Sequence, residues 1–301
     1  MSKLIVTGGA GFIGSHLVDR LIDLGHEVVI VDNLMLGKKE FINKKAEFHQ
    51  VDIKDLKKIE TIFSGAEAVF HLAADPRLPV SINDPLSTHE INVTGTLNVL
   101  LAAKKNNLKK VIFSSSCAVY GNQTLLPIKE STLPNPLSPY GLHKLIGEQY
   151  CRLFSSLYGL PTVCLRYFNV FGPRKLSEGS YPMVIPVFLD QRKKGEKLTI
   201  VGDGTSTRDY IHVSDVVEAN ILAWSQNKLG DGSPINIGYG KQTSVNEIAA
   251  LVGGEAVNLP VRSGEIKSIE ADISLARSIL GWKPTVDVAE GVLSLKKAAG
   301  L

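Results

Sequence analysis

Cysteine is scarce in this chain of 301 residues, which contains Cys117, Cys151 and Cys164. An odd number of cysteines without C-x-x-C spacing argues against structural disulfides and against a zinc site. We therefore expect no bound metal and a reducing, cytoplasmic compartment.

An excess of charge of one sign is also lacking. The chain has 33 basic and 30 acidic side chains, which give a formal net charge of +3. Because acidic and basic side chains nearly balance, the charge gives no reason to expect binding to nucleic acid or to a membrane surface. No apolar run approaches the roughly 18–20 residues that span a bilayer. The first residues lack the charged, apolar and small segments of a signal peptide, which again favours the cytoplasm.

Hydrophobic residues are plentiful, at 44% of the chain, and they occur in short continuous runs. Runs of this kind are typical of parallel strands that are covered on both faces. Strands are predicted at 3–9, 26–32, 46–53, 66–74, 109–116 and 160–170. Segments with helical spacing separate them, at 12–24, 90–106 and 138–158. This alternation predicts an α/β fold with a Rossmann-type, doubly wound parallel sheet.

The alternation stops after about residue 170. From there the pattern indicates a hairpin over 197–213 and a helix over 214–227, followed by a final α/β segment. We therefore predict a doubly wound domain over residues 1–170 and a smaller C-terminal α/β domain over 171–301. The chain is expected to return to the first domain at about 213–240.

The first predicted strand runs into "TGGAGFIG", which contains Gly8, Gly11 and Gly14 and opens a helix. Asp32 ends the next strand, 18 residues beyond Gly14. Together these features form the dinucleotide-binding fingerprint, in which backbone N–H groups at a helix N-terminus bind a pyrophosphate. Asp32 can accept hydrogen bonds from the adenosine ribose and would repel a 2′-phosphate, which favours NAD. Asp52, after the third strand, either meets the adenine amino group or caps a turn.

Three further side chains suggest acid–base chemistry. Ser116 ends a predicted strand, where ligands bind in such sheets, and Tyr140 and Lys144 follow at i,i+4 spacing on one helix face. A phenol has a pKa of about 10 and must lose about three units, or about 4 kcal/mol, to act as a base near neutrality. Lys144 and the positive nicotinamide ring are the charges expected to lower it. Ser116 would hydrogen-bond the reacting oxygen.

At this point the chain resembles the nucleotide-sugar epimerases among the extended short-chain dehydrogenases/reductases, and UDP-glucose 4-epimerases most of all. The resemblance covers nearly the whole chain. Its motifs are "TGGAGFIGSHL", "VDN", "HLAA", "NVTGTLNVL", "SSSCAVYG", "YGLHK", "RYFNVFGPR", "TRDYIHVSD", "RSGEI" and "LGWKP".

The resemblance implies that Ser116, Tyr140 and Lys144 form the catalytic triad. Tyr140 would remove the proton of the sugar 4-hydroxyl while hydride passes from C4 to tightly held NAD. The 4-keto sugar would then turn over and take the hydride back on its other face. The implied cofactor-binding residues are Gly8, Gly11, Phe12, Ile13, Gly14, Asp32, Asn33, Asp52, Ile53, Leu72, Ala73, Ala74, Asn92, Ser114, Tyr140, Lys144 and Tyr167.

The resemblance also assigns the smaller domain to substrate binding. Asn169 would meet the diphosphate, Arg208 and Arg262 would clamp its oxygens, and Glu265 would accept from the nucleotide ribose. The two arginines could instead serve in surface salt bridges. The implied substrate-binding residues are Ser116, Tyr140, Asn169, Val184, Val201, Arg208, Arg262, Glu265 and Ile269.

Several positions depart from the family pattern. Cys117 stands where dehydratases and decarboxylases carry an acid, which favours plain epimerisation, and it is expected to be a packed thiol. Val201 and Met183 replace residues that contact the uracil in many relatives. Ile269 lies where side-chain size is thought to gate the sugar 2-substituent. The proline-rich stretch "DPRLPVS" (75–81) is expected to line the sugar pocket.

The expected function is therefore a UDP-hexose 4-epimerase acting on UDP-glucose and UDP-galactose. UDP-N-acetylglucosamine 4-epimerase, UDP-glucuronate 4-epimerase or decarboxylase, and dTDP-glucose 4,6-dehydratase are the alternatives within the fold. A non-catalytic NAD(H)-binding regulator is the alternative outside enzymes. The resemblance also implies a homodimer formed by helices 90–106 and 138–158, although their apolar faces could equally belong to the monomer core.

Overall fold

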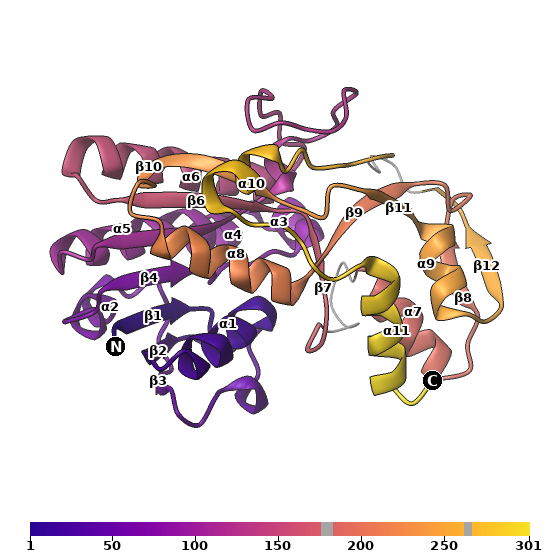
Figure 1. The fold of residues 1–301 in the computed structure, drawn as a ribbon, viewed down its shortest axis with the longest axis horizontal. Coiled ribbons are helices and arrows are strands. Elements are labelled where there is room, and N and C mark those ends of the chain that lie inside the picture. The colour runs from indigo at the N-terminus through magenta and orange to yellow at the C-terminus, as the bar shows by residue number, and fades with distance from the viewer. Residues whose placement is uncertain (176–182, 262–266) are drawn as a thin grey trace.

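A seven-stranded sheet is the largest unit of the protein in this computed structural model, which describes residues 1–175, 183–261 and 267–301 (Figure 1). Its strand order is β3-β2-β1-β4-β5-β6-β10, and each neighbouring pair is parallel. The strands are β1 (Lys3–Thr7), β2 (Glu27–Val31), β3 (Glu47–His49), β4 (Ala68–His71), β5 (Lys110–Ser116), β6 (Thr162–Tyr167) and β10 (Asp231–Ile237). The predicted Rossmann-type sheet is confirmed, with its switch point between β1 and β4.

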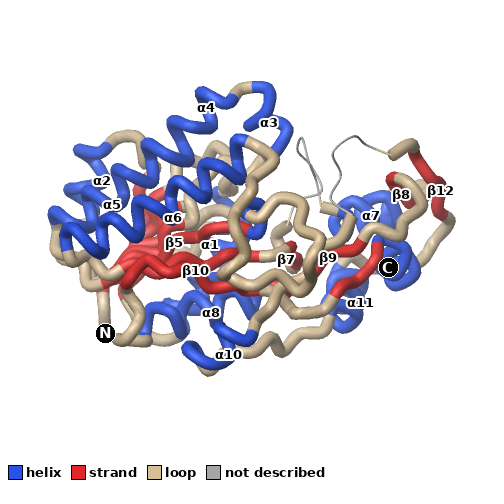
Figure 2. The backbone as a smooth tube through the Cα atoms, turned by 90° about the horizontal axis from the view of Figure 1, so that it is seen from above, coloured by secondary structure: helices blue, strands red, loops and turns tan. Residues whose placement is uncertain are grey.

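Helices cover both faces of this sheet (Figure 2). On one face lie α2 (Leu56–Ile62), α5 (Gly95–Lys105) and α6 (Pro139–Tyr158). On the other face lie α1 (Phe12–Asp23), α8 (Val213–Ser225) and α10 (Ser274–Leu280). Because both faces are covered, the central strands are buried nearly end to end, and one hydrophobic cluster forms on each side.

A smaller lobe is built on two short sheets (Figure 1). One sheet contains β7 (Asn169–Phe171), β9 (Thr207–His212) and β11 (Gln242–Ser244), and the other pairs β8 (Leu198–Val201) with β12 (Ala256–Leu259). They pack with α7 (Val184–Lys193), α9 (Val245–Val252) and α11 (Val288–Ala298) around a third, smaller cluster. The chain returns from this lobe to the large sheet through α8 and β10.

The prediction of a hairpin over 197–213 is wrong. β8 pairs in parallel with β12, and β9 pairs with β7 and β11, so the two strands belong to different sheets. The turn between them is real, since Gly202 and Gly204 have positive φ angles of 70° and 73°. Local alternation indicated two strands, but the partner of β8 lies more than 50 residues away in sequence, where a short pattern carries no information.

The helix predicted over 90–106 is also divided. Two short helices, α3 (Leu78–Asn83) and α4 (Pro85–His89), lead into a π-helical segment at Glu90–Thr94, and α5 continues from there. Single π-turns of this kind are frequent at functional sites. Two 3₁₀ turns, Lys39–Phe41 and Cys117–Val119, complete the elements. In the described ranges, no helix is both long and apolar enough to cross a membrane.

Candidate active site

The glycine loop between β1 and α1 has geometry that only glycine permits. A Cβ on Gly14 would lie 2.1 Å from the carbonyl oxygen of Gly8, and Gly8 itself has a φ of 72°. Among the described residues, no side chain caps the N-terminus of α1 at Gly11, and its first turn contains no acid. The amide groups and the positive end of this helix therefore face the space above the loop, as a pyrophosphate site requires.

Asp32 follows β2 and lies beside this loop. Its Oδ2 accepts from the Ala10 amide at 3.0 Å and its Oδ1 from the Leu34 amide at 2.8 Å. The side chain is only 7% exposed, and burial raises the pKa of this carboxyl while the two amides lower it. Gly37 has to be glycine because a Cβ there would lie 2.8 Å from Oδ1. These observations fit a ribose-binding carboxylate next to a pyrophosphate loop, as an NAD site needs.

Asn33 and Asp52 extend the same edge. Asn33 Nδ2 donates to Asp52 Oδ2 at 3.0 Å, while Asp52 Oδ1 accepts from the Lys54 amide at 2.8 Å. Of the two roles expected for Asp52, the structure shows the capping of a turn. Contact with the adenine stays a prediction. Ile53 is buried against Gly95, where a Cβ would lie 2.5 Å from the Ile53 Cδ1.

A chain of hydrogen bonds that the motifs did not reveal connects the end of β4 to the glycine loop. Thr7 Oγ1 contacts His71 Nδ1 at 2.8 Å, and His71 Nε2 contacts Thr96 Oγ1 at 3.0 Å. Burial lowers the pKa of His71 to about 3, so the ring is neutral. The Leu72 amide donates to the Thr7 carbonyl, and the Ala73 amide donates to Thr7 Oγ1. The predicted cofactor strip at 72–74 is thereby fixed beside Gly8.

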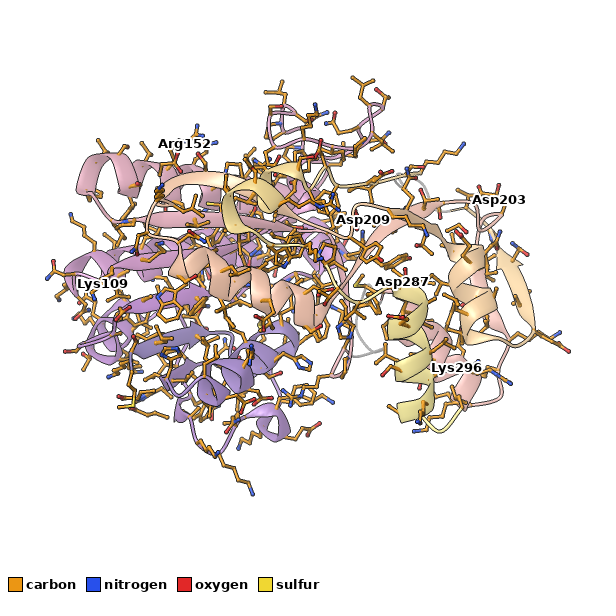
Figure 3. The ribbon with its side chains drawn as sticks, viewed as in Figure 1. Lys109, Arg152, Asp203, Asp209, Asp287 and Lys296 are labelled. Atoms are coloured by element: carbon orange, nitrogen blue, oxygen red, sulfur yellow. The ribbon has the colours of Figure 1, made fainter. Side chains whose placement is uncertain are left out.

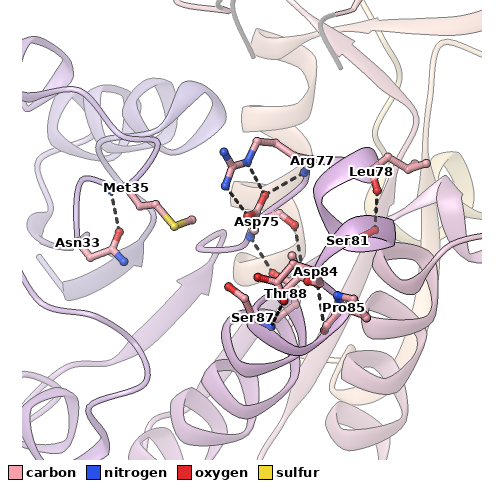
Figure 4. Close-up of polar contacts among 11 residues, drawn as sticks. Asn33, Met35, Asp75, Arg77, Leu78, Ser81, Asp84, Pro85, Ser87 and Thr88 are labelled. Carbon is pink, nitrogen blue, oxygen red and sulfur yellow. Dashed lines mark hydrogen bonds and ion pairs between the residues drawn. The ribbon is translucent and has the colours of Figure 1, made fainter. Parts of the chain in front are cut away.

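Asn92 lies in the π-helical segment and holds the chain after that strip. Its Oδ1 accepts from the Asp75 amide at 2.7 Å, and its Nδ2 donates to the Asp75 carbonyl at 2.9 Å. The Asp75 carboxylate binds Arg77 through Nε at 2.9 Å and a terminal nitrogen at 2.7 Å (Figure 4). Asn92 therefore shapes the 75–81 segment, and its contact with the cofactor stays a prediction.

The 75–81 segment ends against the predicted catalytic helix. Ser81 Oγ donates to the Leu78 carbonyl (Figure 4) and accepts from the Tyr140 amide at 3.2 Å. Ser138 caps α6, accepting from the Gly141 amide, and Pro139 occupies the first turn, as at many helix starts. Tyr140 is thus held from two sides at the beginning of α6.

Ser116 lies close enough to the phenol of Tyr140 to affect its pKa. Burial raises the pKa of Tyr140 to about 12, Ser116 lowers it, and Cys117 and Asp75 raise it. The expectation that Lys144 and the nicotinamide ring together lower this pKa stays a prediction.

The Lys144 ammonium is held at the end of β5. Its Nζ is 6.0 Å from the Tyr140 ring centroid and 5.0 Å from that of Phe113, and it donates to the Ser114 carbonyl at 2.6 Å. One helical turn places the two side chains on one face, but the ammonium binds the strand end below. Burial lowers the pKa of Lys144 to about 8.

Ser116 ends β5, and its Oγ also accepts from the Ala118 amide at 3.2 Å. Burial raises the pKa of Cys117 to about 12, which makes it an unreactive thiol, as expected. Tyr167 ends β6 and donates to Asn220 Oδ1 at 2.8 Å, so its hydroxyl is already bonded within the core.

The predicted substrate residues lie on several elements of the smaller lobe and of the main core. Asn169 Nδ2 donates to the Asp209 carbonyl at 3.2 Å, and Arg208 donates to the Thr207 carbonyl at 2.8 Å, so both lie at the β7–β9 ladder. Val184 begins α7 and Val201 ends β8. The remaining three differ: Ile269 is buried in the main hydrophobic cluster, and Arg262 and Glu265 lie outside the described residues.

Comparison with known proteins agrees with this geometry. A family model described as the NAD dependent epimerase/dehydratase family matches residues 4–238. The UDP-glucose 4-epimerase of Mycolicibacterium smegmatis is 37% identical over 304 residues, which cover 96% of this chain and 96% of that protein.

Solved structures give the same result. The UDP-glucose 4-epimerase of Thermotoga maritima, solved with UDP-glucose, is 40% identical with a TM-score of 0.93, covering 99% of this chain and 97% of that one. The UDP-N-acetylglucosamine 4-epimerase of Methanobrevibacter ruminantium, solved with UDP-N-acetylmuramic acid, is 38% identical with a TM-score of 0.93, covering 100% and 99%. The predicted resemblance, the enzymatic nature of the protein and its NAD cofactor are confirmed at the level of the family: the chain belongs to the NAD-dependent epimerase/dehydratases.

Proposed function

We propose that this protein is a UDP-hexose 4-epimerase that interconverts UDP-glucose and UDP-galactose. The observation that carries the proposal is the buried Tyr140 phenol at the carboxyl edge of the sheet, whose pKa Ser116 lowers, with an unreactive thiol at Cys117. Because position 117 offers no acid, elimination and decarboxylation lack a group to assist them. Support also comes from relatives with this name.

Bound NAD supplies a carrier that takes hydride from the sugar C4 and returns it. The glycine loop would hold its pyrophosphate, Asp32 its adenosine ribose, and the 72–74 strip its nicotinamide side. The side chain of Lys144 is fixed by the Ser114 carbonyl and keeps a positive charge on this side of the site below a pH of about 8.

The protein's own chemistry is proton transfer at Tyr140. Its Oη accepts the proton of the sugar 4-hydroxyl, holds it while the ketone turns over, and returns it to the new hydroxyl. Ser116 Oγ bridges the two oxygens and stabilises the phenolate. Burial holds the pKa of the phenol at about 12, and we expect the positive charges of Lys144 and of bound NAD to lower it together.

The smaller lobe would hold the nucleotide. We assign residues 1–170, with the return at 213–240, to NAD binding and residues 171–301 to substrate binding. Asn169 and Arg208 at the β7–β9 ladder would contact the diphosphate, together with Arg262. Homodimer formation and a cytoplasmic location belong to the same proposal.

UDP-N-acetylglucosamine 4-epimerase is the second candidate. One observation favours it: a structural neighbour with a TM-score of 0.93 carries that name. Position 269 carries isoleucine, which is smaller than tyrosine but bulkier than serine or cysteine, so this position does not separate the two candidates.

The test is product analysis. The purified protein is incubated separately with UDP-glucose, UDP-galactose, UDP-N-acetylglucosamine, UDP-glucuronate and dTDP-glucose. The products are separated by chromatography, and their masses are measured by mass spectrometry. We expect UDP-glucose and UDP-galactose to interconvert without change of mass. Loss of CO2 or water, or no conversion of any sugar by NAD-loaded protein, contradicts the proposal.

A further inference from the structure

A buried ion pair joins the catalytic helix to the sheet, outside every residue assigned above. Arg166 on β6 donates to Glu148 on α6 through Nε at 2.8 Å and a terminal nitrogen at 2.6 Å. Both side chains are only 4% exposed. The two-pronged geometry fixes the orientation of both groups as well as their separation.

The same carboxylate binds the strand that carries Ser116. Ser115 Oγ donates to Glu148 Oε1. Ser115 lies between Ser114, whose carbonyl accepts from Lys144, and Ser116, which lowers the pKa of Tyr140. Glu148 therefore holds the middle residue of a strand end whose two neighbours contact the catalytic tyrosine and lysine.

Helical spacing makes these contacts act together. Tyr140, Lys144 and Glu148 follow at intervals of four, so they lie on one face of α6. The contacts of Lys144 and Glu148 show that this face is turned toward β5 and β6. The helix lies very close to the sheet, since a Cβ on Gly147 would lie 2.4 Å from the Phe113 ring. A small shift of α6 would change all three contacts at once.

The network behind the pair is fully bonded. Arg166 also donates to the Tyr120 hydroxyl at 2.8 Å, and that hydroxyl donates to Asn236 Oδ1 on β10 at 2.7 Å. Tyr120 and Asn236 are completely buried. The orientation of Arg166 is thus fixed from the side of the sheet, independently of Glu148.

Stability alone does not explain such a pair. Burying two charges is costly, and apolar residues of similar volume often replace a buried pair without loss of stability. What a fully bonded pair adds is one defined arrangement of helix and strands.

We propose that Glu148 is a positioning residue for the epimerase reaction. Its carboxylate, oriented by Arg166, sets α6 against the end of β5 so that Tyr140, Lys144 and Ser116 keep their mutual geometry. This inference rests on the proposed function.

Removing the negative charge of Glu148 should also change the pKa of Lys144. From the strands, neutral His71 on β4 and Phe113 on β5 face Lys144. From α6 itself, the facing groups are Tyr140, His143, Glu148 and Cys151. Arg166 of β6 lies behind Glu148. Burial lowers the pKa of Lys144, whereas the charge of Glu148 raises it. Without that charge the pKa falls, so the ammonium is lost at lower pH.

The experiment compares Glu148→Gln with a matched control, Thr162→Val. Thr162 is buried on β6 and donates to the Cys151 carbonyl of α6 at 2.9 Å, so it also joins this helix to this strand, but beyond the active end. We expect Glu148→Gln to lower kcat about 10- to 100-fold, with KM within about twofold, because small misplacements of reacting groups have effects of this size. The alkaline limb of its pH–rate profile should move to lower pH. Thr162→Val should lose stability and keep both kcat and the profile.

A second variant guards against simple unfolding. In Glu148→Leu/Arg166→Met the pair is replaced by apolar side chains, and circular dichroism and NAD content show whether the protein folds. We expect a folded protein with kcat lowered as in Glu148→Gln. If the folded variants keep the kcat and pH profile of Thr162→Val, the inference is wrong. A wild type that converts no nucleotide sugar refutes the proposed function instead.

Discussion

At the edge of the large sheet, predicted cofactor residues join segments that are far apart in sequence, whereas the described substrate residues of the smaller lobe contact the backbone of their own small sheet. Asp32 binds the glycine loop and Asn33 binds Asp52. By contrast, Asn169 and Arg208 contact carbonyls of β9, and Val201 ends a strand that has one partner.

The difference follows from the way the two parts are built. Seven parallel strands bring many carboxyl ends to one edge, so polar side chains from distant segments meet there. Two short sheets around a small core bring fewer side chains together. We infer that the large sheet carries the chemistry and that the smaller lobe selects the substrate.

The strongest way to break this comparison is Tyr140→Phe. Removing the hydroxyl removes the only proposed proton acceptor, so the rate of epimerisation should fall about 10³-fold. NAD should still be retained, because the glycine loop and Asp32 are untouched even though Tyr140 is itself a predicted cofactor contact. Steady-state rates and absorbance of extracted NAD measure the two quantities, and an active phenylalanine variant would exclude Tyr140 as the base.

Gly14→Ala should have the next largest effect. The new methyl group would lie 2.1 Å from the Gly8 carbonyl oxygen, so the loop has to open and NAD should no longer be retained. Gly11→Ala is the graded control, since its Cβ would lie 3.1 Å from the same oxygen. NAD content and Tm should fall further for Gly14→Ala than for Gly11→Ala, and equal losses would contradict the assignment of the loop.

Asp209 lies between the large sheet and the smaller lobe (Figure 3). It accepts from the amides of Tyr239, Gly240 and Ala271, and burial raises its pKa to about 6 from a model-peptide value of 3.8. A raised carboxyl pKa contributes stability that is complete below pH 3.8 and is lost as pH rises through 6. The loss amounts to about 3 kcal/mol of the free energy of unfolding.

Asp209→Asn removes this titration. The free energy of unfolding of the wild type minus that of the variant should therefore decrease between pH 4 and pH 7, measured by urea denaturation. Exposed Asp203, whose pKa is lowered by Thr205, is the control with the opposite sign. Parallel curves for wild type and Asp209→Asn would contradict the raised pKa.

The smallest effect is expected in the smaller lobe. Val201→Phe adds a ring where relatives stack one on the base, and stacking is worth about 1–3 kcal/mol per base. KM for UDP-glucose should fall several-fold while kcat stays unchanged. A change in kcat alone would place position 201 in the chemistry and remove the distinction between the two parts.

Local pattern was enough for much of this protein. Continuous apolar runs indicate parallel strands, and glycine spacing indicates the pyrophosphate loop. Ser138 and Pro139 mark the start of α6. These features depend on backbone angles and on periodicity within a few residues, so the sequence by itself determined the large sheet, the NAD site and the position of Tyr140.

The tertiary structure decided which distant groups meet. It paired β8 with β12, directed Lys144 to the Ser114 carbonyl and brought Arg166 to Glu148. The reason is that burial and partner choice depend on segments far apart in the chain. The spacing of Tyr140 and Lys144 places them on one face, but only the packed sheet determines what the ammonium binds.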